Sequence, residues 1–120
     1  MSFQKGYRGL EVEDVGGVTV VTVRYRQILS EAAVQALSEQ LLRLAAGSGR
    51  RLILNFGNVE RLSSAVLGSV VALNRAVRRT GGRLVLCAVR PDLSHLFTIT
   101  RLDRYLDLYP SEGEALQDLL

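Results

Sequence analysis

Apolar and polar positions follow two different periods along this chain, and the change of period marks its elements. Near the N-terminus Leu10, Val12 and Val15 alternate with acidic residues, which predicts a first strand. The pair Gly16–Gly17 is typical of a hairpin turn, and the β-branched run over residues 18–25 predicts a second strand. Because that run does not keep one strict alternation, we expect both of its faces to be covered.

Two longer segments carry apolar residues at steps of three and four, the spacing of an amphipathic helix. The first begins after Ser30, a residue that favours the N-cap, and is expected to end at the glycines of residues 47–49. The second begins at Ser63–Ser64 and is expected to end at residues 80–82. The apolar positions of these two helices are Val34, Leu37, Leu41 and Leu44, and Val66, Leu67, Val70, Leu73 and Val77.

Three shorter strands and two further helical segments complete the prediction. The apolar runs over residues 51–56 and 83–89 are interpreted as central strands buried on both faces, and residues 105–109 as a short last strand. The segment after Pro91 is expected to cover the core, and Ser111 with Glu114 has the spacing of a capping box that opens a final helix.

This order of elements predicts an α/β fold. Strands that are separated by helices need crossover connections, and crossovers imply a mixed, largely parallel sheet, here of about five strands with about four helices. The first hairpin adds an antiparallel edge. Val18 and Val20 on that hairpin are expected to form an exposed apolar edge through which two copies of the chain could pair as a homodimer.

The amino-acid composition argues against several classes of function for this chain. With one Cys and one His the chain has neither a disulfide framework, nor a Cys-based zinc site, nor a paired-His mechanism, so we expect no metal, no cofactor and no enzymatic activity. Fifteen basic residues against twelve acidic ones give a net charge of +3, and their scattered placement argues against nucleic acid as a partner. The single Cys87 lies in an apolar run and is predicted to be buried.

The location expected from the sequence is cytoplasmic. The N-terminal residues have no apolar signal core, and no apolar run approaches the roughly 20 residues that a membrane span needs. We therefore predict no membrane insertion.

The third predicted strand, the loop after it and the second helix carry the most informative polar residues. Asn55, Gly57 and Asn58 lie where that strand ends, at the edge of a parallel sheet where function gathers. Ser63 and Ser64 lie where the next helix begins. A serine there either caps the helix or accepts a phosphate, since a helix N-terminus presents free N–H groups and positive partial charge.

These segments together resemble a known family. Asn55–Phe56, Ser63–Ser64, Leu67–Gly68, Gly81–Gly82 and the segment from residue 84 to 116 follow one another as in a STAS domain, specifically a stand-alone anti-sigma factor antagonist. The resemblance covers residues 8–120 and leaves residues 1–7 as an N-terminal tail. It implies a mixed sheet whose helices pack mainly on one face.

The resemblance also implies a partner-switching function. The unphosphorylated domain would bind an anti-sigma factor that is also a GHKL-type serine kinase, and this binding would release a sigma factor. The kinase would then phosphorylate a residue at the start of the second helix, and a PP2C-type phosphatase would reverse the step. The partner-binding residues implied here are Asn55, Gly57, Asn58, Ser63, Ser64, Ala65, Leu67 and Gly68.

Two alignments with the family's usual motif, Asp-Ser-Ser/Thr-Gly-Leu-Gly, remain open. Matching Leu67–Gly68 to the motif's Leu-Gly places Ala65 at the acceptor position, whereas matching the serine pair places Ser64 there. Either way the motif's Asp is absent, and Asn55 is neutral where the family often has Asp. Ser64 is the first choice as phosphate acceptor and Ser63 the second.

Other functions fit the same residues. One alternative is a constitutive, unphosphorylated STAS interaction module, for example in a stressosome-like or lipid-transport ATPase complex. Another is a small nucleotide or ligand binder, because parallel sheets offer a crevice where the strand order reverses.

Overall fold

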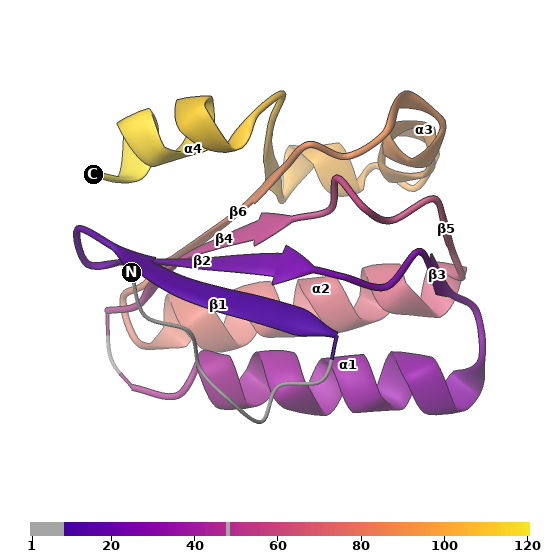
Figure 1. Ribbon diagram of the computed structural model, residues 1–120, viewed down its shortest axis with the longest axis horizontal. Helices are drawn as coiled ribbons and strands as arrows, with labels where there is room; N and C mark the ends of the chain where they lie inside the picture. The colour runs from indigo at the N-terminus through magenta and orange to yellow at the C-terminus, as the bar shows by residue number, and fades with distance from the viewer. Residues whose placement is uncertain (1–8, 48) are drawn as a thin grey trace.

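A five-stranded sheet lies between two layers of helices in the computed structural model, which describes residues 9–47 and 49–120 (Figure 1). The predicted tail, residues 1–7, lies outside the described residues. The elements are β1 (Leu10–Val15), β2 (Val18–Val23), β3 (Gln27–Ile28), α1 (Glu31–Leu44), β4 (Arg51–Asn55), β5 (Arg61–Leu62), α2 (Ser64–Arg79), β6 (Arg83–Cys87), α3 (Pro91–Ile99), the 3₁₀ turn η1 (Leu102–Arg104), β7 (Asp107–Tyr109) and α4 (Glu112–Leu119).

The sheet has the mixed topology that the sequence predicts. Its strand order is β1-β2-β4-β6-β7, in which β1 and β2 are antiparallel and all later neighbours are parallel. The hairpin turn is made by Gly16 and Gly17, whose φ angles of 58° and 86° are the positive values that a type I′ turn requires. The predicted α/β fold with about five strands and four helices is confirmed.

Alternate residues of each central strand enter two separate cores. On β4, Leu52 and Leu54 face α1 and α2, whereas Ile53 faces α4. On β6, the same alternation brings Leu84 and Leu86 into the larger core. The helices α1 and α2 therefore cover one face of the sheet, and α4 alone covers part of the other face (Figure 1).

The prediction of an exposed apolar edge on the hairpin is wrong. Val18 and Val20 are 0% and 3% exposed, because they pack against Ala115 and Leu119 of α4. Their strand also lies inside the sheet, between β1 and β4. These two valines therefore offer no surface for a homodimer.

Several element boundaries differ from the prediction by one or two residues. The strand predicted over residues 83–89 ends at Cys87 since Ala88 has a φ of 58°, outside the extended region.

The segment after Pro91 is a nine-residue helix, with Leu93 and Phe97 buried in the larger core. Ser30 and Ser111 cap α1 and α4 as predicted, since their hydroxyls accept from the N–H of Ala33 and of Glu114.

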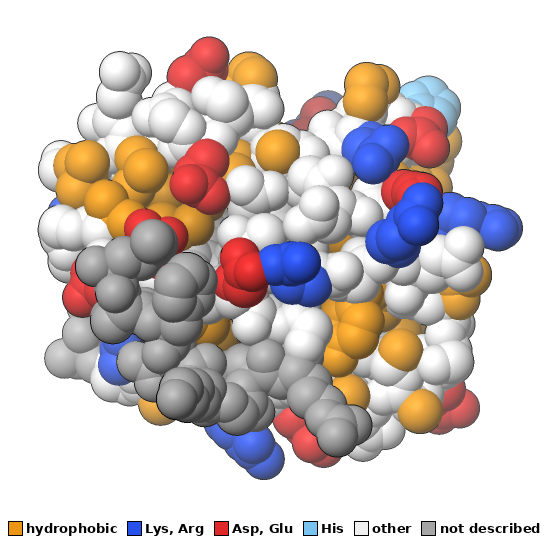
Figure 2. All heavy atoms as spheres, viewed as in Figure 1, with side chains coloured by type: hydrophobic (Ala, Val, Ile, Leu, Met, Phe, Trp, Pro, Cys, Tyr) orange, Lys and Arg blue, Asp and Glu red, His pale blue; other side chains and the backbone are white. Residues whose placement is uncertain are grey.

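Charged side chains are mixed on the surface. Figure 2 shows Lys and Arg side chains lying beside Asp and Glu side chains on the face that carries β1. Arg24, which directly follows β2, and Glu11 of β1 form one such ion pair. In the described part of the chain, no helix is both long and apolar enough to cross a membrane.

Candidate functional site

The carboxyl end of β4 is organised by one amide side chain. Asn55 Oδ1 accepts a hydrogen bond from the N–H of Gly57 at 2.8 Å, and Asn55 Nδ2 donates to Glu112 Oε1 at 3.0 Å. Asn55 therefore both closes the turn after β4 and ties it to the first turn of α4. An aspartate here would bring a second carboxylate against Glu112, so the amide is the side chain that suits this contact.

Cys87 lies beside Asn55 in the sheet, and its thiol is confirmed as buried. Burial raises the pKa of Cys87 to about 12, and the nearby charge of Glu112 adds to the shift. A thiol that keeps its proton at neutral pH is a poor nucleophile, so Cys87 has a structural role.

The raised pKa of Cys87 predicts a loss of stability in alkali. The unfolded thiol loses its proton above a pKa of about 8.5, whereas the folded thiol keeps it, so the folded state is disfavoured as the pH rises toward 12. The free energy of unfolding of the wild type should fall by roughly 2 kcal/mol more than that of Cys87→Ala between pH 8 and pH 10. Urea unfolding at both pH values measures this difference, and equal losses in the two proteins would contradict it.

The loop from β4 to α2 is held by a two-stranded ribbon that the sequence did not reveal. β3 pairs in parallel with β5, and the N–H groups of Glu60 and Arg61 both donate to the carbonyl of Arg26. The Arg26 guanidinium also binds the Glu60 carboxylate through both oxygens, at 3.0 and 3.2 Å. Strands of two residues have no readable period, so only the three-dimensional structure shows this pairing.

The ribbon also positions the start of α2. The N–H of Ser63 donates to the carbonyl of Ile28 at 2.9 Å, which anchors the serine pair to β3. Ser63 is the N-cap, with φ −82° and ψ 158°, and is half-buried. Ser64 is the first residue of the helix and is exposed.

The N-terminus of α2 differs from those of α1 and α4. Ser63 makes no side-chain capping bond, and the first turn of α2 has no acidic residue. In α1 and α4 the N-cap serine does cap, and acidic residues occupy the first turn. The positive end of α2 therefore lacks the compensation that the other two serine-capped helices have.

The predicted site residues divide into exposed and buried ones. Asn58, Ser64, Ala65 and Gly68 are exposed, and a methyl group added at Gly68 would meet no atom within 4 Å. Leu67 is 4% exposed and belongs to the larger core, so its side chain does not reach the surface. The structure thus brings the serine pair, Ala65 and Gly68 together at one end of the sheet with the loop after β4.

Sequence reasoning missed four contributors to this region. Arg26, Glu60 and Ile28 fix the loop and the helix start, and Glu112 binds Asn55 from 57 positions away in the chain. Leu29, which follows Ile28 of β3, is 45% exposed and presents a large apolar side chain at the surface. Among the described residues, no group of three or more His, Cys, Asp or Glu could hold a metal ion.

Several known proteins are similar to this chain in sequence or in fold. The family model of the STAS domain matches residues 10–115. A protein of Bordetella bronchiseptica named as an anti-sigma factor antagonist, BtrV, is 25% identical over 101 residues, which cover 84% of this chain and 83% of that protein. The structure of an anti-sigma factor antagonist from Mycobacterium paratuberculosis is 28% identical, with a TM-score of 0.80 over 91% of each chain.

A third comparison supports the fold alone. The structure of a STAS domain protein from Planctomyces limnophilus is 21% identical and has a TM-score of 0.83 over 91% of this chain and 96% of that one. The match of the family model covers nearly all of the described elements, from β1 into α4. This chain belongs to the STAS domain family.

Proposed function

We propose that this protein is an anti-sigma factor antagonist that acts by binding, not by catalysis. It binds an anti-sigma factor through the surface formed by Asn58, Ser64, Ala65, Gly68 and Leu29, and this binding releases a sigma factor. Family membership and the names of the relatives from Bordetella and Mycobacterium support this role. We place the complex in the cytoplasm.

The surface itself has the chemistry of a protein interface. Ala65 and Gly68 let a partner approach the backbone of α2 closely, and Leu29 supplies an apolar group that a partner can bury. Ser64 lies beside them at the start of the helix, where an added charge would enter the contact.

The proposal includes regulation by phosphorylation of Ser64, and the state of the α2 N-terminus is the observation that supports it. Ser64 is exposed to a kinase, and the positive end of α2, which no acidic residue of the first turn offsets, would stabilise a phosphate without unfolding the helix. The phosphate would add up to two negative charges to the binding surface. The kinase would be the anti-sigma factor itself, of GHKL type, and a PP2C-type phosphatase would restore binding.

The test combines phosphorylation with binding. The protein is incubated with the cognate anti-sigma kinase and ATP, and mass spectrometry locates the phosphate. We expect it on Ser64 in the wild type and in Ser63→Ala, and we expect none in Ser64→Ala. Ser64→Glu should weaken binding of the anti-sigma factor by about tenfold or more.

A matched charge change elsewhere controls for net charge. Gln117→Glu adds one negative charge on the exposed side of α4, which covers the opposite face of the sheet, and should bind like the wild type. Equal weakening by Ser64→Glu and Gln117→Glu would contradict the proposed surface. Full binding without any phosphate on Ser63 or Ser64 would instead favour the second candidate below.

The second candidate is a constitutive STAS interaction module, in a stressosome-like or lipid-transport ATPase complex. The contact between Asn55 and Glu112 favours it, because the family's common acidic group at this strand end is replaced here by an amide engaged in a structural bond. Such a module would bind its partner with no serine modified.

A further inference from the structure

A cavity lies between α2 and η1, farther along α2 than the serine pair. Its volume is about 490 Å³, within the range of sites that hold small molecules. Arg75, at its edge, is eleven positions after Ser64, so it lies about 16 Å farther along the helix. Val71, the first residue of α2 that lines the cavity, follows Gly68 of the proposed surface by three positions, so the cavity begins about one helical turn beyond that surface.

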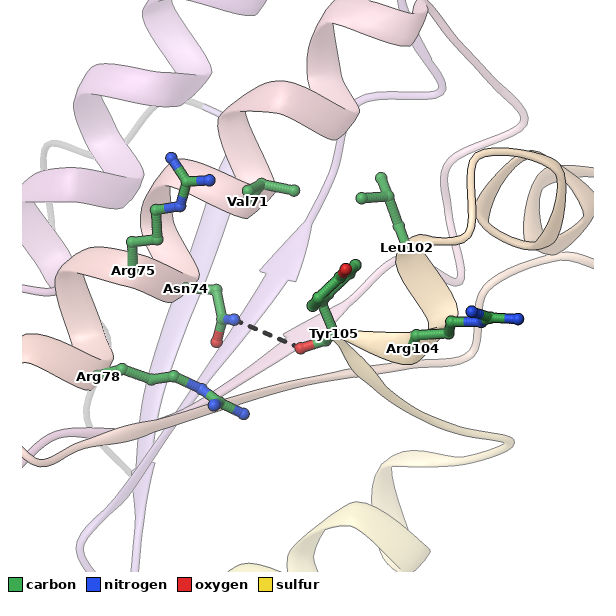
Figure 3. A pocket seen from close by; sticks show the side chains of 7 residues that line it. All are labelled: Val71, Asn74, Arg75, Arg78, Leu102, Arg104 and Tyr105. Atoms are coloured by element: carbon green, nitrogen blue, oxygen red, sulfur yellow. Dashed lines mark hydrogen bonds between the residues drawn. The ribbon is translucent and has the colours of Figure 1, made fainter.

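Positive charge gathers around this cavity without a carboxylate in its wall. Arg75 and Arg78 come from α2, and Arg104 comes from η1. Figure 3 shows Arg78 directed toward the space beside Asn74 and Tyr105, whereas the guanidinium groups of Arg75 and Arg104 point outward at the rim. None of the three forms an ion pair with another described residue, whereas Arg26 and Arg83 each bind carboxylates. Guanidinium groups that remain charged and unpaired at a hollow favour an anion, and their planar donors suit phosphate oxygens.

The floor and walls of the cavity offer polar and apolar contacts in addition to charge. Asn74 is the single polar residue that the described core buries, at 8% exposure, and its Nδ2 donates to the carbonyl of Tyr105 at 3.4 Å. Figure 3 shows Asn74 between α2 and Tyr105, with Arg78 extending from the helix toward the same space. Val71 and Leu102 add apolar wall.

Tyr105 is the exposed aromatic residue of the cavity. Its large, amphipathic ring is 67% exposed. Its backbone is held in place, because its N–H donates a hydrogen bond to the carbonyl of Leu102. A ring presented in this way beside unpaired arginines suits a ligand with a flat or apolar part next to its charge.

We propose that this cavity binds a small organic molecule that carries a phosphate group. Arg78 binds the phosphate oxygens, Arg75 and Arg104 add positive charge at the rim, and the organic part lies against Tyr105 and Leu102. Asn74 offers its amide from the floor. Neither Ser63 nor Ser64 lines this cavity, so we expect it to be occupied whether or not Ser64 is modified.

The test uses phenyl phosphate and inorganic phosphate as probes of the unmodified, full-length protein. Chemical shifts of the Asn74 side-chain amide and the Tyr105 backbone amide follow each titration by nuclear magnetic resonance. We expect both probes to saturate, with phenyl phosphate binding about two- to tenfold more tightly because its ring contacts Tyr105. Tyr105→Ala should remove that preference and leave the affinity for inorganic phosphate unchanged.

Two charge variants show whether the cavity or the general charge of the surface binds the probes. Arg78→Gln should weaken phenyl phosphate by about tenfold or more, since it removes a charged donor from the cavity. Arg79→Gln removes the same charge from the same last turn of α2, but Arg79 does not line the cavity, so its effect should stay below about twofold. Equal weakening by the two variants, or shifts that never saturate, would overturn the site. Equal affinity for the two probes would overturn the assignment to an organic phosphate.

Discussion

Replacing Phe56 by alanine is expected to lower the free energy of unfolding by about 3–5 kcal/mol, the largest effect that we predict for one residue. Phe56 is fully buried in the larger core, directly after β4. Its N–H donates to the carbonyl of Cys87, and its carbonyl accepts from the N–H of Val59. The alanine variant would therefore leave a cavity where the sheet passes into the loop of the proposed binding surface.

Urea or thermal unfolding measures the cost of Phe56→Ala, and Ile99→Ala is its control. Ile99 is also large and apolar but is 63% exposed, so its replacement should change the free energy of unfolding by less than about 0.5 kcal/mol. A similar loss of stability in both variants would show that the region around Phe56 is not packed as described.

The second large effect concerns Gly82, between α2 and β6. A methyl group on Gly82 would lie 2.3 Å from the carbonyl oxygen of Arg50 and 2.8 Å from a methyl carbon of Val77. The backbone of Arg50 cannot move freely, because its carbonyl accepts the N–H of Arg83 at the start of β6. Gly82→Ala should therefore lower the free energy of unfolding by roughly 3 kcal/mol or more.

Gly68→Ala is the matched control for Gly82→Ala. Gly68 lies inside α2, where an added methyl meets no atom within 4 Å, so alanine should raise the free energy of unfolding by about 0.5–1 kcal/mol through helix propensity. The two substitutions are chemically identical and should have opposite signs in unfolding measurements. A mild effect at Gly82 would contradict the close approach of the two chain segments.

The candidate site was only partly predictable from the sequence. Ser63 and Ser64 predict the start of a helix, because a serine directly before apolar residues at helical spacing is a local sequence signal. The same signal treats Ser30, Ser63 and Ser111 alike, yet only Ser30 and Ser111 accept a capping hydrogen bond. Ser63 differs from the other two serines because the pairing of β3 with β5 sets the direction in which the chain enters α2. No local sequence pattern indicates this pairing.

Burial of the hairpin shows the same limit. The β-branched run of β2 correctly predicts a strand covered on both faces, since its valines occupy both parities of the alternation. The element that covers Val18 and Val20 is α4, a helix about a hundred positions later in the chain. For that reason the sequence suggested an exposed edge at Val18 and Val20 where the structure has a core.

The sequence by itself determined the order of the larger strands and helices, the mixed sheet and the two capped helices, because periodicity and capping depend on residues that are near one another in the chain. Only the tertiary structure decided which surfaces stay open. It pairs Asn55 with Glu112, buries Leu67, leaves the start of α2 exposed and brings Asn74 and Arg78 to the same cavity as Tyr105. These contacts join residues that are distant in the sequence, and the packing of helices against the sheet, not local preference, brings them together.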